Sequence, residues 1–316
     1  MKNITLHVLP RQEITWINFF TSEYPADSIA LDGFLIGGPS FDYGQRKVNF
    51  DHHSGVVRSA TMSTCMQVYL AIKEGLFDLF AGKKPNVYIN DCDQDTALAV
   101  WLLENHNLFH DATSIPNISR ILNLTNYLDI TAGAFPVNLS DDLMASHSWV
   151  FQPYTNFRTS GELFSANAAT MFLNLEQTMS RLSALMMGQS GKVELDTRHG
   201  ILWQDGQMTI VDEIGGNDAR YYLYSKGMKA FIAIVAKRKD GRTVYSIGKK
   251  SRYISFDILA FFKRMNELDS LPDGNSLPMG EQAGGSDLIG GSSRLHASGL
   301  SWEQMKDIYL ETQHSS

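Results

Sequence analysis

The stretch KVNFDHH, residues 47–53, passes from an extended segment directly into one aspartate and two histidines. The stretch VYINDCDQD, residues 87–95, does the same with three aspartates after a short segment whose composition favours a strand. Both polar clusters therefore stand where a predicted strand ends. Because ligands of α/β proteins bind outside the carboxyl ends of the strands, these two stretches predict an α/β fold with a polar site at one edge of its sheet.

The first half of the chain continues this alternation of strands and helices. Apolar residues recur at helical spacing over residues 63–72, and a second helix is expected at about Ala97 to Glu104. Residues 116–186 are expected to be mostly helical. We therefore predict a first domain over residues 1–187, with a mostly parallel sheet and flanking helices.

The second half follows a glycine-containing break at residues 188–191 and is rich in predicted strands. A helix is expected at about residues 257–268, followed by a glycine- and serine-rich loop over residues 270–293. This pattern predicts a smaller α+β domain over residues 200–316. The strands expected in this domain cover residues 200–203, 208–211, 221–224, 230–236 and 244–247.

Composition narrows the class of protein. The chain has 316 residues, of which 43% are hydrophobic, so it can bury a large core. Its two cysteines, Cys65 and Cys92, are too few for a disulfide framework and favour a reducing compartment. No signal-peptide pattern is present, and no apolar run approaches the roughly 20 residues of a membrane-spanning helix. We predict a soluble cytoplasmic protein with no membrane partner, and a homodimer is the candidate assembly.

Charge is unevenly distributed along the chain. The formal net charge is −7, yet residues 237–252 hold seven basic residues against one aspartate, which is a net charge of +6. The rest of the chain therefore carries −13. Long duplex nucleic acid is a poor partner for such a protein, because phosphate contacts require widespread lysine and arginine. A short anionic ligand on the basic segment is the better match, with a solvated hairpin as the alternative.

The two polar clusters carry the side chains that bind divalent cations. In an extended turn Asp91, Asp93 and Asp95 would point to one side, and a cation would remove their mutual repulsion. An EF-hand is excluded, because Thr96 and Leu102 occupy its sixth and twelfth positions. Taken singly, an exposed acidic turn and a surface pair of histidines are the alternatives. Taken together, the clusters predict a two-metal site that cleaves phosphoesters.

The chain resembles the DHH phosphoesterase family at several motifs. Phe50–His53 is similar to the Asp-His-His motif, and Asn90–Ala99 to the Asp-x-Asp-x-Asp motif that leads into a helix. Asn126–Asp129 resembles the later motif whose aspartate completes the metal set. The second half resembles the substrate-binding domain appended in that family. Its strand, helix and glycine-rich motif resemble residues 243–251, 256–260 and 290–299.

The resemblance implies a set of metal ligands and catalytic residues. His53 would contact the scissile phosphate or protonate the leaving oxygen, and Asp51 would orient or bridge. The family has one more single aspartate, for which Asp32 and Asp42 both qualify by position, and Asp42 is favoured because Asp32 ends no clear apolar strand. Two divalent cations are implied, manganese with magnesium as the alternative. Their ligands would be His52, Asp91, Asp93, Asp95 and Asp129, with Asp42.

The implied substrate is a short oligonucleotide or a nucleotide-like phosphoester. Glycine amides approach anions closely and arginine offers a forked contact, so the loop over residues 290–294 would hold one end of the substrate. A flexible linker is the alternative for the run from Gly280 to Ser293. The substrate-binding residues expected on this basis are Gly290, Gly291, Arg294, His296, Arg242 and Lys249.

Two departures from the family pattern motivate a second hypothesis. The acidic motif follows the Asp-His-His motif in this chain, whereas it precedes that motif in most of the family. The glycine motif has Ser293 in place of its usual histidine. The alternative hypothesis is therefore a non-catalytic nucleotide-binding or regulatory protein that keeps the metal pocket.

Overall fold

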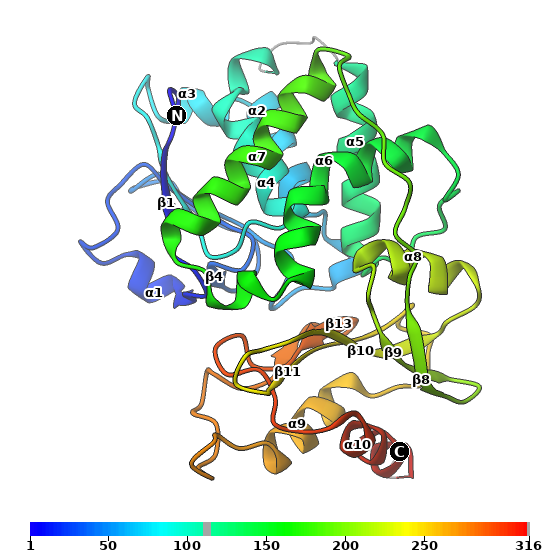
Figure 1. Ribbon diagram of the computed structural model, residues 1–316. Coiled ribbons are helices and arrows are strands. Elements are labelled where there is room, and N and C mark those ends of the chain that lie inside the picture. The colour runs from blue at the N-terminus through cyan, green and yellow to red at the C-terminus, as the bar shows by residue number, and fades with distance from the viewer. Residues whose placement is uncertain (110–114, 315–316) are drawn as a thin grey trace. The chain divides into compact units, whose positions relative to one another are not determined.

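The computed structural model describes residues 1–109 and 115–314 and confirms the α/β class (Figure 1). The chain forms two compact units. The first comprises Met1–Ile130, Asp141–Tyr154 and Ala166–Val193. The second comprises Thr131–Ser140, Thr155–Ser165 and the chain from Glu194 onward. The domains predicted over residues 1–187 and 200–316 assumed that the chain passes from one domain to the other only once. In the structure, two earlier segments also pack with the second unit.

The first unit contains a five-stranded sheet in the order β1-β7-β3-β6-β5. The first four strands run parallel, and β5 is antiparallel to β6 at one edge, so the prediction of a mostly parallel sheet is confirmed. Leu31 of β3 pairs with Phe50 of β6, which brings the carboxyl ends of these strands level. The strands are β1 (Thr5–Val8), β3 (Ser28–Leu31), β5 (Ser40–Asp42), β6 (Lys47–Phe50) and β7 (Asn86–Ile89).

Helices flank this sheet. The central one is α4 (Gln94–Glu104), whose residues 95–103 are all buried. It packs against α2 (Thr64–Lys73), α5 (Pro116–Ile130) and α7 (Ala168–Met186). Because only residues 90–93 separate α4 from β7, its first turn lies at the carboxyl end of a central strand. A further long helix, α6 (Asp142–Thr159), passes from the first unit into the second at Thr155, and the 3₁₀ turn Glu162–Ser165 belongs to the second unit. Smaller elements of the first unit are α1 (Trp16–Phe19), α3 (Leu76–Leu79), the strand pair β2 (Ile14–Thr15) and β4 (Leu35–Ile36), and 3₁₀ turns at Arg58–Ala60 and His106–Leu108.

The second unit is built on a mixed sheet in the order β12-β13-β11-β10-β9-β8. Alternate residues of β10 face opposite layers, which explains its continuous apolar run. Ile232 packs with α9 (Ile258–Leu268) and α10 (Trp302–His314), which lie side by side in Figure 1, whereas Phe231 packs on the other side. The strands are β8 (Gly200–Gln204), β9 (Met208–Asp212), β10 (Ala230–Lys237), β11 (Thr243–Lys249), β12 (Gly284–Gly285) and β13 (Ile289–Gly291).

One predicted strand of this unit is wrong. Residues 221–224 lie in helix α8 (Asn217–Ser225), which connects the parallel strands β9 and β10. Parallel neighbours require a crossover connection, and here a helix provides it. Leu223 and Tyr224 are buried against Phe231 of β10. The aromatic composition of the segment suggested a strand, but the crossover needed a helix with one apolar face.

Within the described residues, no helix has the length and apolar character that crossing a membrane requires.

Candidate metal centre

The carboxyl ends of three neighbouring strands bring polar side chains together in the first unit. Asp32 follows β3 directly, and the Asp51–His53 cluster follows β6. Asp93 is the N-cap of α4, and Asp95 lies in the first turn of that helix after β7. In the sheet β7, β3 and β6 are adjacent and parallel, so their ends meet at one edge. This is the edge at which α/β proteins bind ligands.

His52 lies at the centre of the cluster. Its Nε2 atom is 2.6 Å from Asp129 Oδ2, 3.4 Å from Asp95 Oδ2 and 3.7 Å from Asp32 Oδ1. His53 Nδ1 is 3.6 Å from the same Asp32 oxygen. Among residues 1–109 and 115–314, two groups of three residues have ligand atoms close enough to share an ion, and both groups contain His52. They are Asp32 with His52 and His53, and His52 with Asp95 and Asp129.

Asp32 is held in a restricted orientation. Its backbone has a φ of +53°, a left-handed conformation that non-glycine residues adopt mainly where the surrounding structure enforces it. The hydroxyl of Thr64 donates to Asp32 Oδ1 at 2.8 Å, and the hydroxyl of Thr96 donates to Oδ2 at 2.8 Å. These two buried hydroxyls fix the carboxylate without supplying a positive charge.

Asp95 is held by the first turn of α2. The backbone N–H of Thr64 donates to Asp95 Oδ2 at 2.6 Å, and the backbone N–H of Cys65 donates to Oδ1 at 2.7 Å. Both N–H groups would otherwise lack partners, because they begin a helix. The same Oδ2 atom also lies 3.4 Å from His52 Nε2. Secondary structure thus orients this carboxylate without neutralising it.

Several buried polar atoms of the cluster have no hydrogen-bond partner. Both ring nitrogens of His52 lack one, although its side chain is completely buried. The same holds for Asp129 Oδ2 and Asp51 Oδ2. The close approach of Asp129 Oδ2 to His52 Nε2 does not have the alignment of a hydrogen bond. Buried polar atoms without partners are rare, and a shared cation would satisfy those around His52.

Electrostatics agree with this geometry. Burial, followed by repulsion from neighbouring carboxylates, raises the pKa of Asp32 and Asp95 and raises that of Asp93 to about 7. Burial and the charge of Arg58 lower the pKa of His52 to about 4, so its imidazole is neutral at pH 7, as a metal ligand must be. A divalent cation at this position would stabilise the ionised carboxylates.

His53 and Asp51 form a separate pair. Asp51 Oδ1 accepts from His53 Nδ1 at 2.8 Å and from the His53 backbone N–H at 3.1 Å. This arrangement keeps a proton on Nδ1, so Nε2 is the ring nitrogen that can gain or lose a proton. Burial favours the neutral ring, but the charge of Asp32 and the hydrogen bond to Asp51 outweigh it and raise the pKa of His53. The side chain of His53 is 29% exposed, whereas that of His52 is fully buried.

Asp42 lies away from the cluster, which corrects the preference for it over Asp32. It belongs to β5, which is antiparallel to β6, and it pairs with Lys47 at the amino end of that strand. His52 follows the carboxyl end of β6, so the two residues belong to opposite edges of the sheet. Asp42 Oδ2 instead accepts the backbone N–H of Gln45 at 2.6 Å. All four residues of the segment Ser28–Leu31 are buried in β3, so Asp32 does follow a core strand.

Asp91 is not in either group of candidate ligands among the described residues. Its Oδ1 accepts the backbone N–H of Cys92 at 2.6 Å. The sequence argument assumed an extended turn, in which alternate side chains share one side. The chain instead starts a helix at Gln94, with Asp93 as N-cap accepting from the Thr96 N–H, so the alternation ends there.

The residues predicted to bind substrate lie in the second unit, and several have structural partners there. Arg242 is buried and donates to Asp269 and to the carbonyl oxygens of His296, Ser270 and Ala297, which contradicts its assignment to substrate. Lys249 Nζ donates to the Phe256 carbonyl at 2.7 Å.

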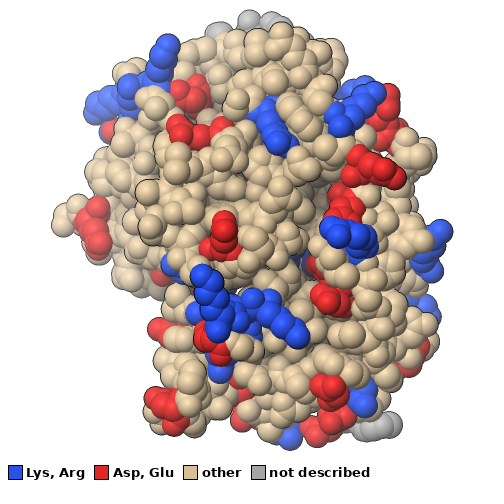
Figure 2. Space-filling view, in the orientation of Figure 1, with Lys and Arg blue, Asp and Glu red and all other residues tan. Residues whose placement is uncertain are grey.

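The glycine-rich motif is part of the sheet. Gly290 and Gly291 lie in β13 and pair with β11. A side chain at Gly290 would collide with the Gly284 carbonyl and the Phe262 ring, so close packing requires glycine here. His296 Nε2 is 2.7 Å from Glu281 Oε2. Arg294 is exposed. Figure 2 shows Lys and Arg side chains (blue) gathered in one group on the face in view, among scattered acidic side chains (red).

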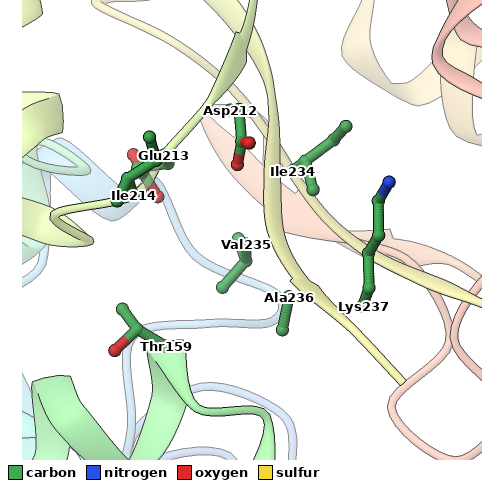
Figure 3. A pocket seen from close by; sticks show the side chains of 8 residues that line it. All are labelled: Thr159, Asp212, Glu213, Ile214, Ile234, Val235, Ala236 and Lys237. Atoms are coloured by element: carbon green, nitrogen blue, oxygen red, sulfur yellow. The ribbon is translucent and has the colours of Figure 1, made fainter. Parts of the chain in front are cut away.

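A cavity of about 350 Å³ lies within the second unit (Figure 3). Asp212 and Glu213 line it from the end of β9, and Thr159 lines it from the end of α6. Glu213 is not available to a ligand, because Arg220 Nε and Nη2 donate to its two oxygens at 2.7 Å each. The hydroxyl of Thr159 donates to the Thr155 carbonyl at 2.9 Å. The cavity therefore offers little free polar chemistry compared with the cluster around His52.

Comparison of the chain with protein-family models, with curated proteins and with solved structures finds no match.

Proposed function

We propose that this protein is a divalent-metal-dependent phosphoesterase similar to the DHH family, which hydrolyses a short oligonucleotide or a nucleotide-like phosphoester. One observation carries the proposal: Asp32 and Asp95 from neighbouring strand ends and the partly exposed Asp129 from α5 converge on His52, which is fully buried and has no hydrogen-bond partner. Carboxylate and imidazole ligands together suit manganese, with magnesium as the alternative.

The ligands divide naturally between two cations. His52, Asp95 and Asp129 would hold one of them. Asp32 would contribute to the second, since it lies close to both histidines. Asp93, which is in neither group of candidate ligands and caps the helix that carries Asp95, would complete it. When bound, a pair of divalent cations supplies the positive charge that polarises and neutralises a phosphoryl group during attack.

His53 is the proposed proton donor of the site. Asp51 holds the proton on Nδ1 and favours the charged ring, so Nε2 can contact a phosphoryl oxygen or protonate the leaving oxygen. Its partial exposure also suits a residue that meets substrate, whereas the fully buried His52 suits a ligand.

The substrate class rests on charge and compartment. The basic segment 237–252 and Arg294 suit a short anionic molecule, and the net charge of −13 in the rest of the chain disfavours a long duplex. Arg242 is excluded from this surface, because Asp269 and three carbonyl groups bind its guanidinium. Cys65 and Cys92 are buried free thiols, which agrees with a proposed cytoplasmic location.

A second candidate function is a non-catalytic nucleotide-binding protein that retains the metal pocket. The construction of the second unit favours it, because Gly290 and Gly291 form part of β13 rather than an open anion-binding loop. Ser293, at the position of the family's histidine, is itself buried.

Turnover assays separate the two functions. The purified protein would be incubated with Mn²⁺ and bis-(p-nitrophenyl) phosphate, with small dinucleotides and with pyrophosphate. We expect hydrolysis of at least one of them, while tight Mn²⁺ binding without any turnover would favour the non-catalytic protein. Failure to bind Mn²⁺ at all would rule out both functions. In the same assay His53→Ala should lose turnover and keep the metal content of the wild type, as measured by elemental analysis.

A further inference from the structure

Asp129 reaches the cluster by a different route from the other proposed ligands. Asp32, His52 and Asp95 follow the ends of sheet strands, whereas Asp129 lies in the last turn of helix α5. Its side chain is 24% exposed, compared with 2% or less for the other three. A carboxylate on a helix end needs a separate anchor, because no sheet register fixes its position.

Arg58 is that anchor. Its Nη2 donates to Asp129 Oδ1 at 3.0 Å, and its Nε donates to the Asp129 backbone carbonyl at 3.1 Å. The carbonyls in the last turn of a helix lack intrahelical partners, so this second bond also completes the end of α5. One planar guanidinium thus holds the backbone and the side chain of the same residue. Asp129 Oδ2 remains, 2.6 Å from His52 Nε2.

Arg58 is placed by the same chain segment that carries the two histidines. Arg58 begins the 3₁₀ turn Arg58–Ala60, shortly after His53, and is only 4% exposed. The guanidinium therefore holds Asp129 in one orientation and places a positive charge 3.0 Å from its Oδ1 atom.

We propose that Arg58 is a positioning residue that tunes the metal affinity of this site by presenting a single oxygen of Asp129 to the cation. The inference rests on the proposed function, because it requires that Asp129 bind a metal. Partners that orient metal ligands typically contribute 10–100-fold to metal affinity or activity.

The test measures Mn²⁺ binding by titration calorimetry for the wild type, Arg58→Met and Arg58→Lys. We expect Arg58→Met to weaken Mn²⁺ binding about 10–100-fold. Saturating Mn²⁺ should then restore most of kcat, with KM for substrate unchanged. Arg58→Lys keeps the charge but lacks the fork that reaches both oxygens, so it should recover only part of the affinity.

Arg46→Met is the matched control. Arg46 also forms a forked pair with an aspartate, Asp27, but that residue stands at the amino end of β3, at the sheet edge opposite the cluster. Its Mn²⁺ affinity should equal that of the wild type. If Arg58→Met does not fold, as judged by circular dichroism without metal, Arg58→Lys carries the test with the same direction of effect.

Three outcomes would overturn the proposal, and they differ from one another. An unchanged Mn²⁺ affinity in both Arg58 variants would show that the contact is only structural. Unchanged affinity with kcat lost at saturating Mn²⁺ would make Arg58 a residue that contacts substrate. Absence of Mn²⁺ binding in the wild type would remove the proposed function itself, and with it the role assigned to Arg58.

Discussion

Buried charges are treated differently in the two units of this protein. In the second unit Arg220 and Glu213 form a forked pair with both side chains buried, and Arg242 meets Asp269 together with three backbone carbonyls. In the first unit several carboxylates surround the neutral His52, with Arg58 as the buried guanidinium paired to one of them.

The difference separates structural charges from functional ones. A buried ion pair whose partners are both supplied by the protein needs nothing from outside. Carboxylates that are buried close together without enough counter-charge lose hydration and repel one another, and burial first and repulsion second raise their pKa. Burial alone is therefore no sign of function, whereas burial with incomplete compensation is.

The strongest test of this comparison replaces single aspartates near β6. Asp32→Asn preserves shape in the left-handed backbone conformation but removes the charge, and should lower kcat/KM about ten-thousandfold, or about 5.4 kcal/mol. Asp42→Asn is the control and should leave both turnover and Mn²⁺ binding unchanged. If Asp42→Asn lost metal instead, the assignment of ligands at the carboxyl edge would be wrong.

The opposite behaviour is expected in the second unit. Arg220→Met leaves Glu213 buried without its partner and should lower the free energy of unfolding by about 3–5 kcal/mol in urea denaturation. The double variant Glu213→Leu/Arg220→Met should recover most of this loss, because neither charge remains. If Arg220→Met were as stable as the wild type, Arg220 would not be compensating the buried charge of Glu213.

Metal should stabilise the protein through the cluster around His52. Mn²⁺ at about 100 times its Kd should raise the free energy of unfolding by about 2.7 kcal/mol, because the cation binds the folded state only. The same addition to Asp32→Asn should have little effect. Denaturation curves with and without EDTA measure this difference, and identical shifts in both proteins would point to binding elsewhere.

A buried group outside both clusters predicts the smallest effect. His147 is buried, its Nδ1 has no hydrogen-bond partner, and burial lowers its pKa to about 3. As pH falls below about 6.5, His147 binds a proton in the unfolded chain but stays neutral in the folded protein. The free energy of unfolding therefore falls by up to about 1.4 kcal/mol per pH unit until pH approaches the pKa of the folded state.

Comparison with His147→Gln isolates that contribution. Between pH 7 and pH 5.5 the variant should lose about 1 kcal/mol less than the wild type in urea denaturation. Equal losses in the two proteins would indicate that His147 takes up its proton in the folded state.

Sequence patterns located the strand ends but not all of their neighbours. The clusters at residues 51–53 and 91–95 were visible because each follows a predicted strand, and the structure brings His52, Asp95 and Asp129 together. The choice between Asp32 and Asp42 was not visible in the same way. It depended on β5 running antiparallel to β6, which no local pattern of residues 40–42 indicates.

The same limit explains the errors in the second unit. Residues 221–224 have the composition of a strand, yet they form α8 because β9 and β10 are parallel neighbours. Arg242 belonged to a basic run that suggested a ligand surface, yet Asp269 lies distant in sequence and pairs with it in space. In both cases the deciding partner stands outside the local sequence.

The sequence by itself determined the α/β class, the strand-end positions of the polar clusters and the types of side chain available to a metal. Only the tertiary structure decided which aspartates converge, and that Arg58 holds Asp129 against His52. The physical reason is range. Local conformation follows from residues a few positions apart, whereas the electrostatic environment of a buried group depends on strands and helices that meet only after the chain has folded.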